Sequence, residues 1–191
     1  MIKKTLYLLV LGITYVSLQG CLGPAVVSAG VGAAMVSEDP RTAGTIVDDR
    51  VIVSKLSSRI KDKYPKETNV TVTAYNHVVL LTGQVTSADI KDDLITMVLE
   101  TQSVRDFKDE TTVGELSGFK EAAKDASIKS QVVALLTKNA DVRSIRIKTT
   151  VELGTVYLMG LVARDEGETA AQIAASVKNV VKVIKIFEYV D

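Results

Sequence analysis

Cys21 is the residue of this chain with the most chemistry open to it, because it is the single cysteine among 191 residues. A thiol can act as a nucleophile, bind a metal ion or carry a covalent modification. Metal binding needs further ligands at coordinating spacing, and the sequence places none around the single histidine, His77. We therefore predict no metal site, and we assign His77 to a turn.

Two pairs of adjacent carboxylates, Asp92-Asp93 and Asp165-Glu166, have the side chains that general acid and base catalysis uses. Both pairs stand near the start of a predicted helix, where negative charge complements the helix dipole. The chain also has no glycine-rich phosphate loop, no nucleophile elbow and no cysteine-histidine pairing. We therefore predict no catalytic residues, no cofactor and no enzymatic activity.

The N-terminal segment has the layout of a secretory signal. Two lysines precede an apolar run at residues 6–18, and the small residue Gly20 stands just before Cys21. The run is shorter than the roughly 20 residues that a membrane-spanning helix needs. We predict that residues 1–20 are a signal peptide that is removed.

The four residues Leu18-Gln19-Gly20-Cys21 resemble the lipobox of bacterial lipoproteins, in which a peptidase cuts before the cysteine and lipids are attached to its thiol and amine. The resemblance implies that Cys21 is lipidated. Leu22 stands where aspartate commonly signals retention in the inner membrane, so the resemblance also implies an outer-membrane, periplasm-facing lipoprotein. The alternative is an uncleaved helical anchor, which is disfavoured by Gly23, Pro24, Gly30 and Gly32.

Charge and composition argue against a nucleic-acid partner. Basic and acidic residues balance at 23 each, so no strong overall field attracts a polyanion. Tryptophan is absent and aromatic residues make up 5% of the chain, which leaves few side chains for stacking on bases. Residues 21–45 are rich in glycine, alanine, valine and serine, and we interpret them as the lipidated cysteine followed by a flexible tether.

The rest of the chain is a duplication. Each half opens with an aspartate, which we interpret as a helix cap, followed by apolar residues at i, i+4 and i+8 on one helix face. The two sets are Asp49, Ile52, Leu56 and Ile60, and Asp125, Ile128, Val132 and Leu136. A repeat of this length predicts two similar structural units.

Two predicted strands, a second helix and a third strand follow in each half. The best-matched strands are Val79–Val85 and Val156–Val162, and each follows another β-branched strand and a tight turn. This order predicts an α+β fold in which two helices cover one face of a three-stranded sheet, because alternating strands leave a single apolar side to bury. We place module 1 at residues 46–114, a linker at 115–122 and module 2 at 123–191.

A module of about 65 to 70 residues has a marginal core on its own. We therefore expect the two modules to pack on each other. We also expect Leu116 and Phe119, in the short connector, to be buried between them.

The repeats resemble BON domains, which are named for bacterial osmotic-stress and nodulation proteins. The resemblance rests on the aspartate-led helix pattern, the strand Val-x-Leu-x-Gly-x-Val, and the closing Val104-x-x-Phe107 and Val180-x-x-Val183. Behind a lipobox, the pair is similar to the dual BON-domain lipoproteins of the Gram-negative outer membrane. The departures are Ser103 and Asn179, where the family often has glycine, and His77, which replaces a common turn glycine.

The resemblance implies binding rather than catalysis. BON domains are taken to bind phospholipid surfaces, and the dual lipoproteins support outer-membrane integrity. The implied lipid-facing element is the first helix of the second domain, about Asp125 to Asn139, with a preference for anionic headgroups. We expect its inward stripe to be Ile128, Val132, Leu135 and Leu136. The candidates for phospholipid binding that remain are Ser127, Lys129, Ser130, Val133 and Lys138.

The balance of charge favours the second module as the one that meets an anionic surface. Residues 118–191 carry 11 basic and 9 acidic side chains, whereas residues 45–117 carry 9 and 12. An aromatic residue suited to interfacial insertion is missing at Ser127. The alternative function is a protein interaction scaffold for an envelope partner, which would use a module face or an exposed sheet edge.

Overall fold

The computed structural model describes residues 39–190. The predicted signal peptide, Cys21 and the tether up to residue 38 lie outside the described residues. Residues 40–191 form one compact unit that contains both modules. Within the described part of the chain, no helix combines the length and the apolar character that crossing a membrane requires.

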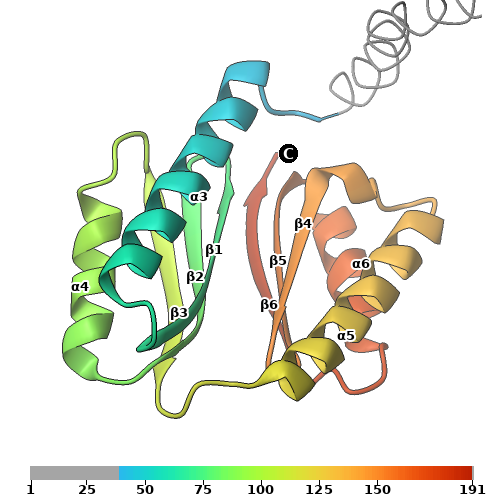
Figure 1. The fold of residues 1–191 in the computed structure, drawn as a ribbon. Coiled ribbons are helices and arrows are strands. Elements are labelled where there is room, and N and C mark those ends of the chain that lie inside the picture. Colours follow the sequence, from blue (N-terminus) through green and yellow to red (C-terminus); the bar gives the residue numbers. More distant parts are fainter. Residues whose placement is uncertain (1–38, 191) are drawn as a thin grey trace, which may run out of the picture. The chain divides into compact units, whose positions relative to one another are not determined.

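Each module follows the predicted order of helix, strand, strand, helix and strand, which confirms the α+β fold (Figure 1). Module 1 contains α3 (Ala43–Lys63), β1 (Thr68–Tyr75), β2 (Val78–Val85), α4 (Ala88–Leu99) and β3 (Asp106–Val113). Module 2 contains α5 (Phe119–Lys138), the 3-10 turn η1 (Ser144–Arg146), β4 (Ile147–Glu152), β5 (Thr155–Val162), α6 (Arg164–Ala175) and β6 (Lys182–Tyr189). In each sheet the middle strand pairs antiparallel with the strand before it and parallel with the last strand.

Both first helices begin earlier than Asp49 and Asp125, the two aspartates that we interpreted as caps. α3 starts after Thr42, whose Oγ1 accepts a hydrogen bond from the Thr45 amide at 3.1 Å. α5 starts after Gly118. The cap interpretation was therefore wrong, and the first three residues of α3 belong to the segment that we assigned to the tether.

Asp49 instead holds the turn between β1 and β2 against α3. The residue is 4% exposed, and its carboxylate accepts hydrogen bonds from the backbone amides of Asn76 and His77, both at 2.8 Å. These two residues have positive φ angles of 50° and 63°, as a tight two-residue hairpin turn requires. His77 is thus a turn residue, as predicted. In module 2 the equivalent bonds join Asp125 to the amides of Leu153 and Gly154 at 2.7 Å and 2.9 Å.

The two central strands are buried on both faces. All eight residues of β2 are buried, and so are six of the eight in β5. One face of each sheet packs under its own two helices, and the other face packs on the sheet of the other module, so the layers are helices, sheet, sheet and helices (Figure 1). Our expectation of a single apolar side was wrong, because the second side of each sheet is apolar as well.

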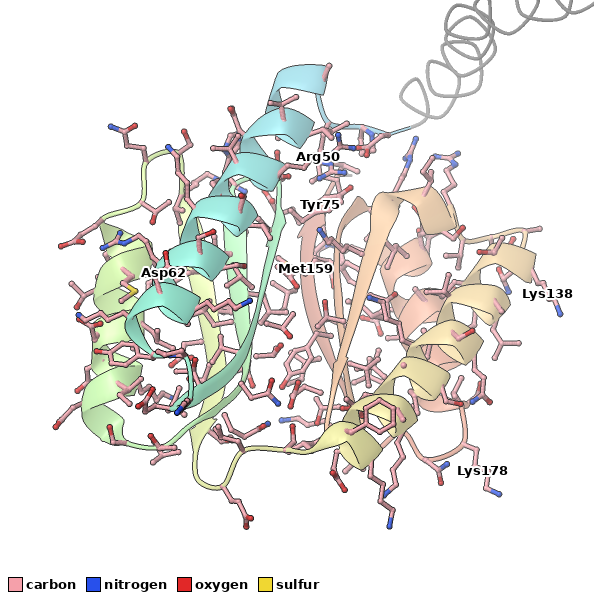
Figure 2. All side chains as sticks on the ribbon, in the orientation of Figure 1. Arg50, Asp62, Tyr75, Lys138, Met159 and Lys178 are labelled. Atoms are coloured by element: carbon pink, nitrogen blue, oxygen red, sulfur yellow. The ribbon has the colours of Figure 1, made fainter. Side chains whose placement is uncertain are left out.

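The contact between the sheets is a buried apolar cluster. Tyr75, Val78 and Leu80 of module 1 meet Tyr157 and Met159 of module 2. Figure 2 shows Tyr75 and Met159 between the two sheets. Burial raises the pKa of Tyr157 to about 12, since an ionised phenol is poorly solvated there. The two modules therefore pack on each other, as predicted.

The connector contributes less to this contact than we expected. Leu116 is half-buried, but Phe119 is 91% exposed at the start of α5. The prediction that Phe119 is buried was wrong, because the sheets form the contact and α5 lies on the outside. The connector is held by polar bonds instead, for example from the Ser117 amide to the Gln84 side chain at 2.9 Å.

A glycine recurs at the same place in both central strands because the backbone beside it, in β1 or at the end of η1, leaves no room for a Cβ. A Cβ on Gly83 would lie 2.0 Å from the carbonyl oxygen of Asn69, and a Cβ on Gly160 would lie 2.4 Å from that of Arg146. Gly83 also has a φ of +116°, which other residues rarely adopt. The repeated glycine is therefore required by packing.

We predict that Asp49→Ala lowers the free energy of unfolding by about 3 kcal/mol. Two turn amides and the Arg41 guanidinium, 2.8 Å away, would lose their acceptor. Urea denaturation of residues 40–191 measures the loss. Asp48→Ala is the matched control, because Asp48 is the exposed neighbour on the same helix, and it should cost less than about 0.5 kcal/mol. Equal losses in both variants would contradict the role assigned to Asp49.

We also predict that Glu152 makes the stability of the fold depend on pH. Burial raises the pKa of its carboxyl above the ordinary 4.5, although a hydrogen bond from the Gln84 amide at 2.6 Å opposes the shift. A raised pKa in the folded state means that the stability Glu152 contributes is present at acid pH and lost as pH rises through that pKa. Glu152→Gln carries no charge, so its stability relative to the natural protein should increase as pH rises from below 4.5 through the raised pKa. A difference in urea midpoint that stays constant across this range would argue against it.

Candidate functional site

Helix α5 turns one side to the sheet of module 2 and the opposite side to solvent. Ile128, Val132 and Leu136 are buried together with Asp125. At about 100° per residue these positions form one stripe along the helix. Leu135, which we expected in the same stripe, is 41% exposed and lies on the flank, so that prediction was wrong.

The solvent side of α5 carries basic side chains and no carboxylate. The helix has two acidic residues, and both serve its own fold. Asp125 is buried against the hairpin turn, and half-buried Glu121 accepts a hydrogen bond from the Gly118 amide at 3.3 Å. The exposed charged residues of the helix are Lys120, Lys124, Lys129 and Lys138.

The corresponding helix of module 1 differs in charge. α3 also has exposed basic residues, but exposed Asp48 and Asp62 stand among them. Some of its cations are paired as well, for example Lys63 with Asp93 at 2.8 Å. The absence of exposed carboxylates among the exposed lysines is therefore a property of α5 and is not shared by α3.

The five residues predicted to bind phospholipid do not share one face of α5. Ser127 and Ser130 lie opposite the buried stripe, and Lys138 points nearly in the direction of Ser127. Figure 2 shows Lys138 reaching into solvent at the C-terminal end of the helix. Lys129 lies about 180° from Lys138 around the helix axis, and Val133 follows it by one turn on the same flank. This flank faces the groove beside β1 and β4.

The structure adds Lys120 and Phe119 to the outward face. Lys120 and Lys138 are 18 residues apart, which is about five turns, so they point in the same direction. Phe119 is the most exposed of the large apolar residues in the described chain. It supplies the aromatic side chain that is missing at Ser127. We missed it because Gly118, the N-cap that places Phe119 at the first helical position, was assigned to the connector.

More apolar surface lies at the same end of module 2. Leu153, in the β4–β5 turn, is 48% exposed, and Val181, just before β6, is 79% exposed. With Lys124 and Ile128 they line a cavity of about 510 Å³. Figure 1 shows the start of α5, the β4–β5 turn and the start of β6 at one end of the module. Apolar and basic side chains thus occur together there.

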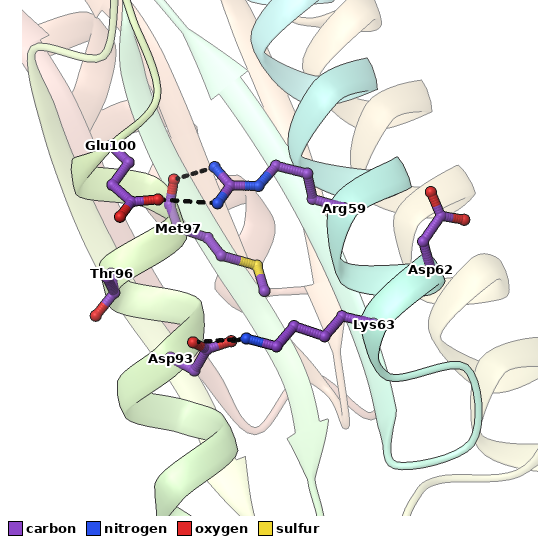
Figure 3. Close-up of a pocket in the computed structure, with 7 residues that line it drawn as sticks. All are labelled: Arg59, Asp62, Lys63, Asp93, Thr96, Met97 and Glu100. Atoms are coloured by element: carbon purple, nitrogen blue, oxygen red, sulfur yellow. Dashed lines mark hydrogen bonds and ion pairs between the residues drawn. The ribbon is translucent and has the colours of Figure 1, made fainter.

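Another cavity of about 510 Å³, between α3 and α4, is crossed by two ion pairs (Figure 3). Arg59 pairs with Glu100 at 2.9 Å and Lys63 with Asp93 at 2.8 Å. The Lys63 pairing lowers the pKa of the Asp93 carboxyl. Asp93 lies in the second turn of α4, so it joins two helices rather than complementing a helix start. We assign this cluster a structural role.

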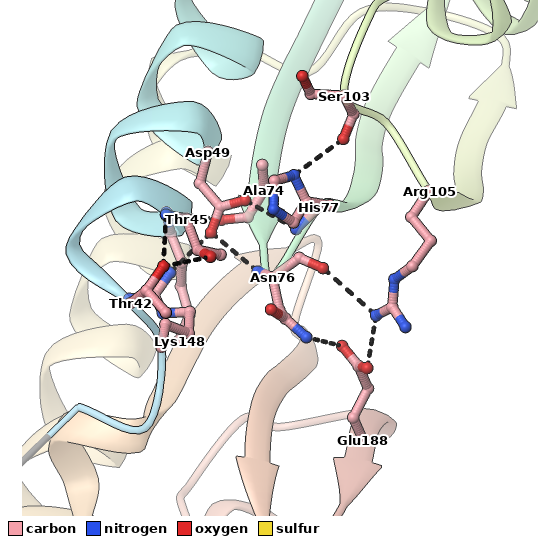
Figure 4. A network of polar contacts seen from close by, with 11 residues as sticks. Thr42, Thr45, Asp49, Ala74, Asn76, His77, Ser103, Arg105, Lys148 and Glu188 are labelled. Atoms are coloured by element: carbon pink, nitrogen blue, oxygen red, sulfur yellow. Dashed lines mark hydrogen bonds and ion pairs between the residues drawn. The ribbon is translucent and has the colours of Figure 1, made fainter.

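His77 belongs to a polar network that joins the modules (Figure 4). Its Nδ1 lies 2.9 Å from the carbonyl oxygen of Ser103. The side-chain amide of the neighbouring Asn76 donates a hydrogen bond to the Glu188 carboxylate of module 2 at 3.0 Å. Glu188 also forms an ion pair with Arg105 of module 1 at 2.5 Å. Among residues 39–190, no three His, Cys, Asp or Glu side chains are grouped as a metal site requires. The network therefore serves the contact between the modules.

Comparison with known proteins gives matches over nearly the whole chain. The model of the BON domain family matches residues 48–115 and 124–191. Outer membrane lipoprotein DolP of Haemophilus influenzae is 36% identical over 185 residues, which cover 96% of this chain and 95% of that protein. The 21 kDa hemolysin of Actinobacillus pleuropneumoniae is 32% identical over 155 residues, 80% of each chain. Among solved structures, CdsD, a structural protein of the Type III secretion system of Chlamydia trachomatis, matches with a TM-score of 0.26 and 14% identity over 70% of this chain and 90% of that chain.

The three departures from the BON pattern keep its backbone conformation. Ser103, Asn179 and His77 have positive φ angles of 67°, 70° and 63°, the conformation for which glycine is best suited. Both modules have the order of elements that the resemblance implied, and the family match covers both. The chain therefore belongs to the BON domain family, of which it contains two copies.

Proposed function

We propose that this protein is a lipid-anchored, periplasm-facing protein of the outer membrane that binds anionic phospholipid through α5 and helps to maintain outer-membrane integrity. The observation that carries the proposal is the solvent side of α5, where exposed lysines stand without a carboxylate. The similarity to a protein named as an outer membrane lipoprotein supports the location. The lipobox at Cys21 supports the anchor.

Electrostatic attraction gives α5 a preference for anionic headgroups. Each lysine close to an anionic surface contributes about 1 kcal/mol, so Lys120, Lys124 and Lys138 together contribute roughly 3 kcal/mol. Partial insertion of the Phe119 ring among the headgroups adds roughly 1 to 2 kcal/mol. The sum corresponds to weak binding that salt screens easily.

Binding of this strength needs a second attachment, which the lipid on Cys21 supplies in this proposal. An anchored chain is confined to the membrane surface, so a weakly binding helix meets headgroups at a high effective concentration. Acyl chains contribute about 0.8 kcal/mol for each buried methylene, so the methylenes of one long chain together contribute more than α5 does. The anchor therefore keeps the protein at the membrane, and α5 gives it a preference for anionic lipid.

The first test uses residues 40–191, which lack the anchor and keep both cores. This fragment should bind phosphatidylglycerol vesicles better than phosphatidylcholine vesicles at low salt, as measured by co-sedimentation. The pair Lys120→Glu and Lys138→Glu should weaken binding to the anionic vesicles at least about tenfold, because attraction becomes repulsion. If the fragment has no preference for anionic vesicles, or the reversed variant binds as before, α5 is not the lipid-binding element.

The matched control is the pair Lys55→Glu and Lys61→Glu on α3. It makes the same change of charge on exposed residues of the corresponding helix in module 1. Binding by the control should fall by much less than binding by the α5 variant.

Crosslinking in cells tests the alternative function as a scaffold, because a scaffold should give one dominant envelope protein as its crosslinked adduct.

A second prediction uses the absence of tryptophan from the chain. Phe119→Trp places a single indole at the start of α5, at little cost in stability because the site is exposed. Its fluorescence emission should shift to the blue on addition of anionic vesicles and stay unchanged with neutral ones. Leu99→Trp, at an exposed position in module 1, is the control and should not respond. An unchanged emission from position 119 would remove Phe119 from the binding face.

A further inference from the structure

Two cavities lie between β1 of module 1 and β4 of module 2. The first has a volume of about 370 Å³ and is lined by the N-terminal half of α3 together with Ala74 and exposed Lys148. The second has a volume of about 230 Å³ and is closed by α5, with Lys129 on its wall. Both lie along the seam where β1 and β4 meet, which Thr73 and Thr150 bridge with a hydrogen bond at 3.1 Å. We call this seam the inter-module groove.

Three cations from three different elements stand along this groove: Arg50 and Lys148 line the first cavity, and Lys129 lines the second. Arg50 belongs to α3, Lys129 to α5 and Lys148 to β4. Within the described residues, none of them is within ion-pairing distance of a carboxylate. Lys148 makes one hydrogen bond, to the Ala74 carbonyl oxygen at 3.4 Å, and Figure 4 shows it beside that residue. In the first cavity the cations Arg41, Arg50 and Lys148 therefore outnumber the single carboxylate, Asp49.

The carboxylates that line the groove are already engaged. Asp49, in the first cavity, forms an ion pair with Arg41 at 2.8 Å and accepts hydrogen bonds from two backbone amides of the β1–β2 turn. The Arg41 guanidinium also stacks on the Tyr75 ring, 3.9 Å from its centroid. In the second cavity, the Asp125 carboxylate accepts hydrogen bonds from the backbone amides of the β4–β5 turn. The Glu152 carboxylate accepts one from the side-chain amide of Gln84.

The environment of Lys148 shows the effect of this crowding of positive charge. Burial lowers the pKa of its ammonium, and the charges of Arg41, Lys129 and Arg50 lower it further, whereas Asp49 acts in the opposite direction. The charged form of Lys148 is therefore destabilised where it stands. A bound anion would reverse that effect.

We propose that Arg50, Lys129 and Lys148 form a binding site for a phosphate group in the inter-module groove. A planar guanidinium and two ammonium groups provide the charge-assisted donors that a phosphate takes. The larger cavity falls within the roughly 300 to 1,000 Å³ that is usual for small-ligand sites. A phosphate held there would bind α3, β4 and α5 together, and so both modules.

This site is separate from the outward face of α5, because Lys129 points about 180° away from Lys138. The phosphate can come from a lipid headgroup or from a soluble molecule. Arg41, at the rim of the groove, follows Cys21 by 20 residues. A lipid anchor at Cys21 would thus keep the groove within about 70 Å of the membrane, the length of a fully extended chain.

The first experiment measures the Tm of residues 40–191 in inorganic phosphate, with chloride at the same ionic strength as the reference. Phosphate at ten times its Kd should raise Tm by about 3 to 5 °C, because the ligand binds only the folded state. The double variant Arg50→Gln and Lys148→Met should lose this shift. Its own Tm in chloride should be no lower than that of the natural sequence, because the substitutions remove like charges.

The control for charge is Lys55→Gln with Lys108→Met, which removes one exposed cation from α3 and one from a strand outside the groove. This control should keep the phosphate-induced rise in Tm. Amide chemical shifts add a local readout, because phosphate should move the resonances of Ala74 and Lys148. Shifts spread over all exposed lysines would show non-specific binding and count against the site.

The second experiment identifies the source of the phosphate with phosphatidylglycerol vesicles. If a headgroup occupies the groove, the Arg50→Gln and Lys148→Met variant binds these vesicles about tenfold more weakly than the charge control. If a soluble phosphate occupies it, the variant loses the Tm response and keeps its vesicle binding. The proposal is overturned if the variant keeps both responses, or if the natural sequence has neither. The Lys120→Glu and Lys138→Glu variant leaves the groove intact and should keep the phosphate-induced rise in Tm. Unchanged vesicle binding by that variant would contradict the α5 proposal without affecting the groove proposal.

Discussion

The packing of the two sheets against each other is the constraint on which the rest of this structure depends. Each sheet buries one face under its own two helices, and its second face is also apolar, as Leu80 and Met159 show. A module alone would expose that second face to water, and a domain of this size has little stability to spare. The duplication therefore has a physical reason, because each copy covers the surface that the other cannot bury.

The same packing decides which surfaces remain for function. With the sheets inside, the helices form the outer layers, and what they present is set by their solvent sides. The two first helices share a buried pattern but differ outside it. On α3 acidic residues such as Asp48 stand among the cations, whereas the acidic residues of α5, Glu121 and Asp125, are used by its own fold. A shared fold has thus been given two different electrostatic surfaces.

The duplicated aspartate shows how a correct pattern can carry a wrong interpretation. Asp49 and Asp125 stand before apolar helical stripes, and aspartate is a common N-cap, so the local sequence favoured a cap. Their partners are turn amides 27 to 29 positions further along the chain. No local pattern contains that pairing. Phe119 was misplaced for a related reason, since its exposure depends on where α5 begins and on what covers it.

The sequence alone determined the signal and lipobox pattern at Cys21, the duplication, the order of elements and the buried stripe of each first helix. These features depend on local composition and on periods of 2 and 3.6 residues, which a single segment carries within itself. The tertiary structure alone decided that β2 and β5 are covered twice, that α5 begins early enough to include Lys120, and that Arg50 and Lys148 line one cavity. The reason is that periodicity relates a side chain only to the axis of its own element. What covers that side chain, and which charges stand beside it, depends on residues that are distant in the chain.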